Sequence, residues 1–268
     1  MQPRANWKMT LCLAMSLESL LLPDGVSATA AAIVVFSSFF TSALTASFGL
    51  GGGLALLAIM GAALPPASVI PVHGVAQLGS NSSRLILQWK SVVWPIVSWF
   101  LAGSLIGSIV GARLYVEIPE ALLQALIGVF VLITVYGPKP KGFSPGKKTY
   151  FATGAASAVL SMFVGATGPI AAAMVGVARL DKMKTVATHA GAMAGQHLLK
   201  SIAFGFVGFA YVDWAAIIIA VVIAGFLGAA AGTRLLRNLP EEKFRKGFTL
   251  VLTFFGCYLI GSALLQLF

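Results

Sequence analysis

Polar residues recur at helical spacing in two otherwise apolar segments of the chain. They are His73, Gln77, Asn81 and Arg84 in the first segment, and His189, Gln196, His197 and Lys200 in the second. Side chains three or four positions apart lie on one face of an α-helix, so each set predicts a polar stripe. These groups donate hydrogen bonds or carry positive charge, which is the chemistry that binds a small anion.

The two cations differ in their surroundings. Lys200 has apolar sequence on both sides, and we expect it to supply the positive charge that faces a bound anion. Arg84 lies nearer the end of its segment, so it either faces the same anion or extends to water. His73 and His189 are either ligands of the anion or hydrogen-bonded residues of the core, and the sequence leaves both interpretations open.

Glycine-rich sequence interrupts two apolar segments close to these stripes. The first break contains Gly51, Gly52 and Gly53, and the second contains Thr167 and Gly168. The N–H groups at a helix start have no acceptor within the helix and carry a positive partial charge, so they attract anions. The breaks therefore predict the other half of an anion site. The alternative is that the glycines only allow neighbouring helices to approach closely.

The composition places these residues in a membrane. The 268 residues are 58% hydrophobic and 10% charged, with 18 Lys and Arg against 8 Asp and Glu. Soluble domains carry about 25% charged residues, so this composition excludes a soluble enzyme, a disordered chain and a nucleic-acid-binding protein. The net charge of +10 instead indicates basic residues retained on the cytoplasmic side of a membrane.

Charge-free stretches define the expected elements. Seven stretches lack Asp, Glu, Lys and Arg, namely residues 25–83, 91–112, 121–138, 149–178, 185–199, 214–233 and 247–268. A bilayer-crossing helix needs about 20 apolar residues, and strict alternation typical of a β-barrel is missing. Residues 54–64 and 170–178 follow the two breaks and are predicted to be half-helices. We expect an all-α membrane bundle with about eight full spans.

The two halves of the chain resemble each other. A shift of 116 residues places His73 on His189, and a shift of 121 residues places Gly107 on Gly228. We therefore predict a membrane repeat over residues 30–136, a linker over 137–148 and a second repeat over 149–268. Residues 1–29 are interpreted as a signal-like segment, with a cleavage site near 28–30, or as an additional helix.

Basic residues alternate between corresponding loops of the two halves. This alternation predicts repeats of opposite orientation, an arrangement typical of secondary transporters. The linker contains four lysines and no acid, so we expect it on the cytoplasmic side.

The sequence resembles the sulfite exporter TauE/SafE family. The resemblance rests on the Gly-x-Gly-Gly-Gly break at residues 49–53, its weaker copy at 165–169, the duplicated Gly-x-x-x-Gly-x-Arg and the basic linker. It covers about residues 30–268 and implies a permease of the bacterial inner membrane for small sulfur-containing anions, including sulfite and organosulfonates. The second break reads Gly-Ala-Thr-Gly-Pro, so the two halves of the site are chemically unequal.

We therefore expect a secondary transporter that works by alternating access. An enzyme is not expected, because no nucleophile–base set, cofactor motif or metal spacing occurs in the spans. Protons or the membrane potential are the expected coupling partners, since no carboxylate in the spans suggests a sodium site. A passive anion channel and a non-transporting scaffold subunit are the alternatives.

Overall fold

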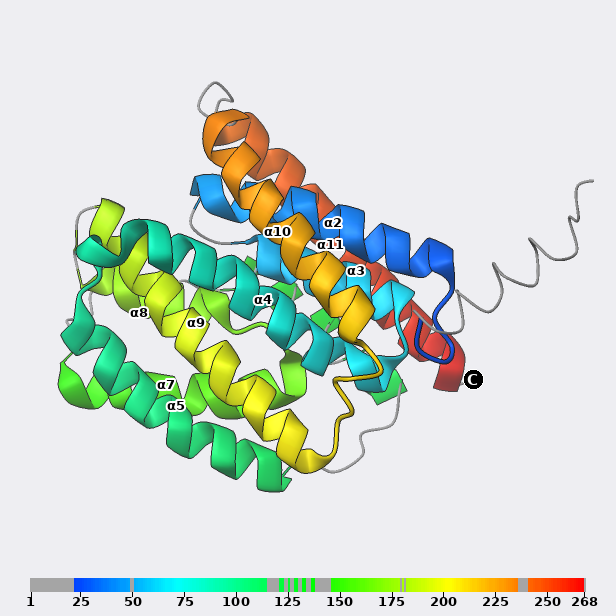
Figure 1. Cartoon of the computed structure of the whole chain (residues 1–268), viewed down its shortest axis with the longest axis horizontal. Coiled ribbons are helices and arrows are strands. Elements are labelled where there is room, and N and C mark those ends of the chain that lie inside the picture. Colours follow the sequence, from blue (N-terminus) through cyan, green and yellow to red (C-terminus); the bar gives the residue numbers. More distant parts are fainter. Residues whose placement is uncertain are drawn as a thin grey trace, which may run out of the picture.

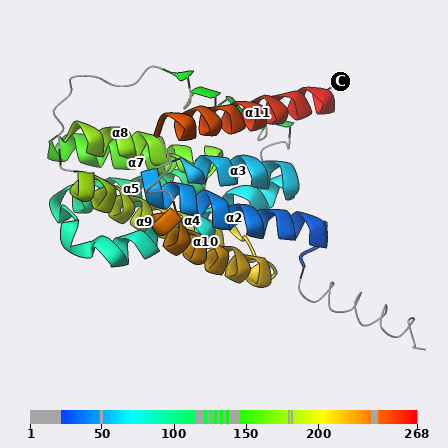
Figure 2. The same ribbon diagram turned by 90° about the horizontal axis from the view of Figure 1, so that it is seen from above.

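The structure of the chain is a computed structural model. It describes residues 22–48, 51–114, 121–122, 125, 128–129, 132–133, 136–137, 146–178, 180, 182–235 and 241–267. These residues form helices and loops and contain no strand, which confirms the predicted all-helical class (Figures 1 and 2). The helices are α2 (Ala28–Phe48), α3 (Gly52–Ala63), α4 (Pro66–Gln88), the short 3₁₀ helix η1 (Trp89–Ser91), α5 (Trp94–Leu114), α7 (Lys147–Val164), α8 (Gly168–Val177), α9 (Lys182–Val207), α10 (Ala215–Leu235) and α11 (Glu241–Leu267).

Two of the described helices, α2 and α5, are long and apolar enough to cross a membrane by length and composition. The helix α3 and the apolar parts of α10 and α11 are shorter. The predicted number of about eight full spans therefore stays a prediction.

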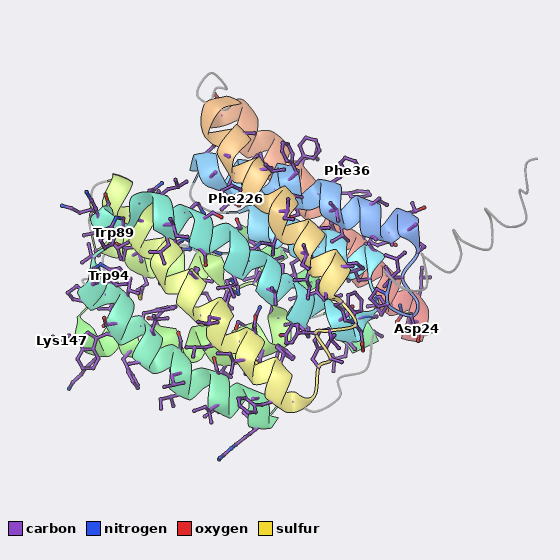
Figure 3. The ribbon with its side chains drawn as sticks, in the orientation of Figure 1. Asp24, Phe36, Trp89, Trp94, Lys147 and Phe226 are labelled. Carbon is purple, nitrogen blue, oxygen red and sulfur yellow. The ribbon has the colours of Figure 1, made fainter. Side chains whose placement is uncertain are left out.

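The outer surface of the bundle carries many large apolar side chains. Phe36 of α2 is 68% exposed and Phe226 of α10 is 55% exposed, and both point away from the bundle (Figure 3). Exposed apolar surface of this extent is unfavourable in water and is typical of a face that contacts lipid. The apolar residues of the chain thus lie on the outer surface of the bundle as well as in its core.

The two short helices begin at glycine-containing breaks. α3 has 12 residues and α8 has 10, so at 1.5 Å per residue each spans roughly half of a hydrocarbon core of about 30 Å. Gly51 precedes α3 with φ 106°, and Gly165 ends α7 with φ 85°. Residues with a Cβ rarely adopt these angles, so glycine explains why the chain turns out of helix at both points. Each half-helix starts two residues before its predicted start at 54 or 170.

Helices from the two halves of the chain pack against each other in pairs. α2 lies along α10, and α5 lies along α7 (Figure 1). A Cβ at Gly107 would overlap the carbonyl oxygen of Ala155 at the α5–α7 contact, and a Cβ at Gly228 would overlap that of Phe39 at the α2–α10 contact. Gly107 and Gly228 are residues that the sequence repeat relates. The same close helix contact therefore occurs twice.

A hydrogen bond from a serine to a carbonyl group also joins the two helices at each of these contacts. Ser104 of α5 donates to the carbonyl of Gly154 in α7 at 3.3 Å, and Ser38 of α2 donates to the carbonyl of Val221 in α10 at 2.8 Å. Ser38 and Gly154 occupy corresponding positions of the repeat. The same position therefore supplies the donor in the α2–α10 pair and the acceptor in the α5–α7 pair.

α4 and α9 lie side by side at the centre of the bundle (Figure 1). A Cβ at Gly74 of α4 would lie 2.9 Å from Cε of Lys200 in α9, and a Cβ at Gly191 of α9 would lie 3.5 Å from Cδ1 of Leu85 in α4. Early positions of one helix thus meet late positions of the other, so the pair is antiparallel. This pairing places the two polar stripes against each other in the interior.

The two ends of the bundle carry different residues. Trp89, Trp94 and Lys147 lie at one end, and Asp24 lies at the opposite end (Figure 3). Nζ of Lys147 lies 5.8 Å from the ring centre of Trp99, a cation–π distance. Tryptophan beside lysine is typical of a membrane–water interface.

The candidate cleavage site at residues 28–30 forms the first turn of α2. Ser27 caps this turn, because its Oγ accepts the N–H of Ala30 at 3.1 Å. Residues 1–21, and 138–145 of the linker, lie outside the described residues.

Candidate functional site

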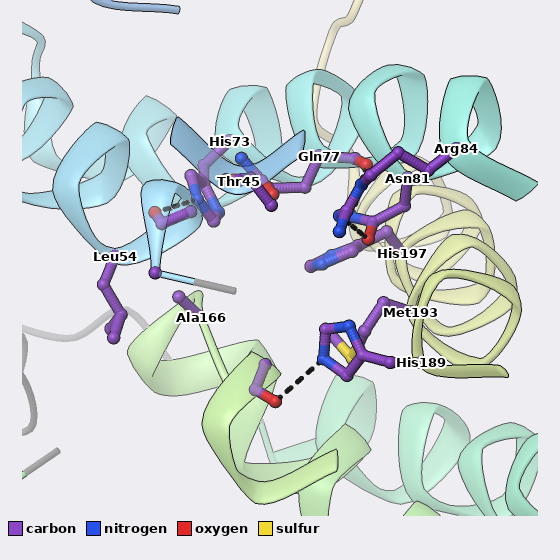
Figure 4. A pocket seen from close by; sticks show the side chains of 13 residues that line it. Thr45, Leu54, His73, Gln77, Asn81, Arg84, Ala166, His189, Met193 and His197 are labelled. Atoms are coloured by element: carbon purple, nitrogen blue, oxygen red, sulfur yellow. Dashed lines mark hydrogen bonds between the residues drawn. The ribbon is translucent and has the colours of Figure 1, made fainter. Parts of the chain in front are cut away.

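A buried cavity lies at the centre of the bundle, where the two helix breaks meet the polar stripes of α4 and α9 (Figure 4). Its volume is about 30 Å³, which holds about one or two water molecules. Its walls come from α2, α3, α4, α8 and α9. The lining residues are Thr45, Gly51, Gly53, Leu54, His73, Gln77, Asn81, Arg84, Ala166, Gly168, His189, Met193 and His197.

The structure brings nine of the thirteen predicted site residues to this cavity. They are Gly51, Gly53, His73, Gln77, Asn81, Arg84, Gly168, His189 and His197. The other four, Gly52, Thr167, Gln196 and Lys200, are not among the lining residues.

Four further residues complete the lining and were absent from the predicted site. Leu54 lies in apolar sequence, which gives no signal of a site, whereas Thr45 belongs to a segment rich in Ser and Thr (residues 37–47) from which no site residue was predicted. Ala166 lies inside the second break, and Met193 occupies the position that the repeat relates to Gln77. The second break thus contained the signal for Ala166, and the repeat contained the signal for Met193.

Arg84 brings a positive charge to the cavity wall. Its side chain is 3% exposed, and Nη2 donates to Oδ1 of Asn81 at 2.6 Å. This burial argues against the alternative in which Arg84 extends to water. The five helices that line the cavity contain no Asp or Glu, so an anion in the cavity would supply the negative charge that they lack.

His73 and His189 contact the starts of the two half-helices in the same way. Nε2 of His73 lies 2.8 Å from the carbonyl oxygen of Gly53 in α3, and Nε2 of His189 lies 3.1 Å from that of Gly168 in α8 (Figure 4). A carbonyl oxygen only accepts hydrogen bonds, so Nε2 must carry the hydrogen in both rings. Nδ1 of each ring is buried and has no hydrogen-bond partner.

His197 adds a third imidazole to the lining. It is 2% exposed, and its ring centre lies 6.2 Å from that of His73 with the planes at 83°. Its Nδ1 is also buried and without a hydrogen-bond partner. In the part of the chain that the structure describes, no group of three or more His, Cys, Asp or Glu is arranged to hold a metal ion.

Polar side chains brace the second break behind the cavity. Oγ of Ser157 lies 2.9 Å from Oγ1 of Thr167 and 3.1 Å from Oε1 of Gln196. Nε2 of Gln196 donates to Oγ1 of Thr167 at 2.9 Å. These contacts join α7, the break and α9 in one triangle of buried groups. Thr167 and Gln196 thus position the start of α8.

Lys200 also contacts the second break. Its side chain is fully buried, and Nζ donates to the carbonyl of Gly165 at 2.7 Å. This bond holds the residue at which α7 ends. The role of Lys200 as the counter-charge of the anion stays a prediction. Because Lys200 does not line the cavity, its charge would act on the anion across the lining residues and not through direct contact.

The glycines of the breaks differ in what surrounds them. A Cβ at Gly52 would overlap the carbonyl oxygen of Thr41, so Gly52 permits close contact between α2 and α3. A Cβ at Gly53 would lie 2.9 Å from Oε1 of Gln77, whereas a Cβ at Gly168 would meet only Nε2 of His189, at 4.0 Å. Gly52 therefore fits the helix-contact alternative, and Gly168 opens toward the cavity.

We expect Gly52→Ala to lower the melting temperature of the detergent-solubilised protein and Gly168→Ala to leave it unchanged. The added methyl group at position 52 meets backbone, which moves only if α2 moves, and such overpacking costs about 1–3 kcal/mol. A loss of this size shifts the melting temperature by several degrees. Thermal unfolding followed by tryptophan fluorescence measures both variants, and equal melting temperatures would contradict the assignment of Gly52 to helix contact.

Half-helix starts that meet at one interior site are a recurrent arrangement in secondary transporters. The comparison with protein families agrees with this class. The model of the sulfite exporter TauE/SafE family matches residues 33–259, and the chain belongs to this family, which confirms the resemblance in the sequence. Membership implies a membrane transporter of sulfur-containing anions rather than an enzyme. No curated protein and no solved structure matches the chain.

Proposed function

We propose that the protein moves a small sulfur oxyanion, sulfite or an organosulfonate, across the bacterial inner membrane by alternating access. The observation that carries this proposal is the cavity in which Arg84 and three imidazoles meet the starts of α3 and α8. Each of these groups favours negative charge, and the lining helices contain no carboxylate that would repel it. The family narrows the anion to the sulfur-containing class.

The binding site that we propose combines side chains with backbone. Arg84 provides charge and planar N–H donors, which match the oxygen atoms of a sulfite or sulfonate group. The first N–H groups of α3, at Gly52 and Gly53, and of α8, at Gly168, provide donors from the opposite side. Asn81 orients the guanidinium through the 2.6 Å contact with Nη2.

Alternating access is supported by the repeated architecture. The duplicated glycine contacts and the antiparallel α4–α9 pair fit two repeats, over 30–136 and 149–268, that are inverted relative to each other. In such carriers the repeats rock around a site near the midplane.

A flux assay in proteoliposomes tests the proposed function. Purified protein is reconstituted, and the uptake of labelled sulfite, thiosulfate, sulfoacetate and sulfate is compared with that of protein-free vesicles. We expect saturable uptake of at least one sulfur anion and counterflow, in which unlabelled anion inside the vesicles drives transient accumulation of label. Saturable flux without counterflow would indicate the passive channel, and no flux of any of the four anions would contradict transport.

We also propose that residues 137–148 face the cytoplasm. The end of the bundle that carries Trp89, Trp94 and Lys147 (Figure 3) would then be the cytoplasmic end, as the excess of basic residues favours. The exposed Asp24 and Asp213 would lie on the other side.

Single cysteines at the two ends measure this orientation. With Cys12 and Cys257 replaced by serine, Gly146→Cys is expected to react with an impermeant maleimide only after the cytoplasmic side is exposed. Val212→Cys, in the α9–α10 loop and 79% exposed, is expected to react in intact spheroplasts. A Cβ at Gly146 meets nothing within 4 Å, so the substitution should not disturb the fold. Labelling of Gly146→Cys in intact spheroplasts would reverse the proposed topology.

A further inference from the structure

We infer that the cavity binds a proton together with the anion, and that the proton resides on Nδ1 of His73 or His189. This inference rests on the proposed function, because the anion is what makes the added positive charge favourable. It begins from the two matching contacts in which each ring donates Nε2–H to a carbonyl of a half-helix, Gly53 at 2.8 Å and Gly168 at 3.1 Å.

These contacts leave one nitrogen of each ring to exchange a proton. Nε2 keeps its hydrogen because the carbonyl oxygen only accepts, whereas Nδ1 is buried and has no hydrogen-bond partner in either ring. The neutral ring presents a lone pair at Nδ1. The protonated ring presents an N–H donor and a positive charge there, and both favour a neighbouring anion.

The ionisable groups that face the two rings are all basic. Arg84 and His197 face His189, and Lys200 and His197 face His73. His73 also faces the backbone of Gly165. α2, α3 and α8 contain no ionisable side chain, and α5, α7 and α10 carry theirs only in their first or last turns. No carboxylate from these helices is thus available to balance an imidazolium.

Proton binding and anion binding are coupled as a consequence. Next to two cations, a third positive charge is unfavourable in a buried cavity, and an anion offsets that repulsion. Each ligand then raises the affinity of the cavity for the other by the same factor. Any anion in the cavity, with one negative charge or with two, offsets part of the repulsion among these cations, so a proton gradient would drive its movement.

The pH dependence of binding tests the coupling without transport. The dissociation constant for sulfite is measured on the full-length protein in detergent, for the parental protein and for the double variant His73→Gln/His189→Gln. Glutamine retains an N–H donor for the carbonyls but does not titrate. Uptake of one proton predicts that the parental dissociation constant falls about tenfold for each unit of decreasing pH, over the range in which the ring is neutral in the empty cavity and protonated in the anion-bound cavity. The double variant should lack this additional slope.

Sulfite itself takes up a proton as the pH falls, and this also changes its dissociation constant. The contribution is the same for both proteins, so it cancels when the parental protein is compared with the double variant. Equal pH slopes in the parental protein and the variant would overturn the inference. Methanesulfonate keeps one negative charge over the same range, so a pH-independent dissociation constant for it in the parental protein would also overturn the inference. This second ligand decides the question if the double variant no longer binds.

A transport measurement separates this inference from the proposed function. At zero membrane potential, an imposed pH gradient is expected to drive sulfite accumulation by the parental protein. The absence of sulfite flux in the parental protein contradicts the proposed function. Flux that the pH gradient does not affect contradicts only the proton site.

Discussion

Arg84→Met is expected to reduce sulfite flux by about 100-fold, because truncating one partner of a buried, hydrogen-bonded charge pair costs about 2–5 kcal/mol. The side chain lines the cavity, is 3% exposed and is oriented by Asn81. Methionine preserves the apolar length of the side chain but removes the charge and every N–H donor. The initial rate of labelled sulfite uptake, at equal amounts of reconstituted protein, measures the effect.

Arg113→Met is the matched control for this substitution. Arg113 lies in the last turn of α5 and does not line the cavity, so the same exchange should leave the rate within about twofold of the parental rate. Arg84→Lys is expected to retain part of the activity, since it keeps the charge but loses the planar donors. A parental rate in Arg84→Met, with an unchanged melting temperature, would remove Arg84 from the anion site.

Lys200→Met should reduce sulfite flux by at least about tenfold and lower the melting temperature, because a buried carbonyl left without its donor costs about 1–3 kcal/mol. Nζ of Lys200 is the donor that holds the carbonyl of Gly165 at 2.7 Å. Loss of this bond loosens the end of α7 and thereby the start of α8. It also removes the positive charge behind the cavity.

Two further variants separate these effects. Lys200→Arg should retain partial activity, since the charge remains while the donor geometry changes. Leu198→Met alters a 47% exposed residue of the same helix and should transport at the parental rate. If the Lys200→Met variant transports sulfite at the parental rate, neither the charge of Lys200 nor its bond to Gly165 is needed for transport.

Sequence reasoning gave the helical class and the elements that form the site. The charge-free stretches and the glycine breaks located both half-helices, and the predicted stripes lie on α4 and α9. These features are local: a break in an apolar run and a helical spacing of polar residues depend on neighbouring positions only. The family was predicted from the glycine breaks together with the duplicated Gly-x-x-x-Gly-x-Arg and the basic linker, and the family model confirms it.

The roles of individual site residues depended on contacts that sequence does not contain. The apolar sequence on both sides of Lys200 predicts a counter-charge for the anion, and the fold shows that Nζ donates to the carbonyl of Gly165. Thr167 and Gln196 are predicted to face the anion, and in the fold both contact Ser157 of α7. Gly52 packs against Thr41. In each case a partner distant in sequence or on another helix determines what the side chain does.

The location of a bound anion tests the central claim most directly. Selenite has the shape and charge of sulfite, and selenium gives an anomalous X-ray signal. Crystals grown with selenite, at a concentration that inhibits sulfite flux, should show an anomalous peak in the cavity, between the Arg84 guanidinium and the starts of α3 and α8. A peak only on the outside of the bundle, or no peak in the cavity at that concentration, would contradict the proposed site.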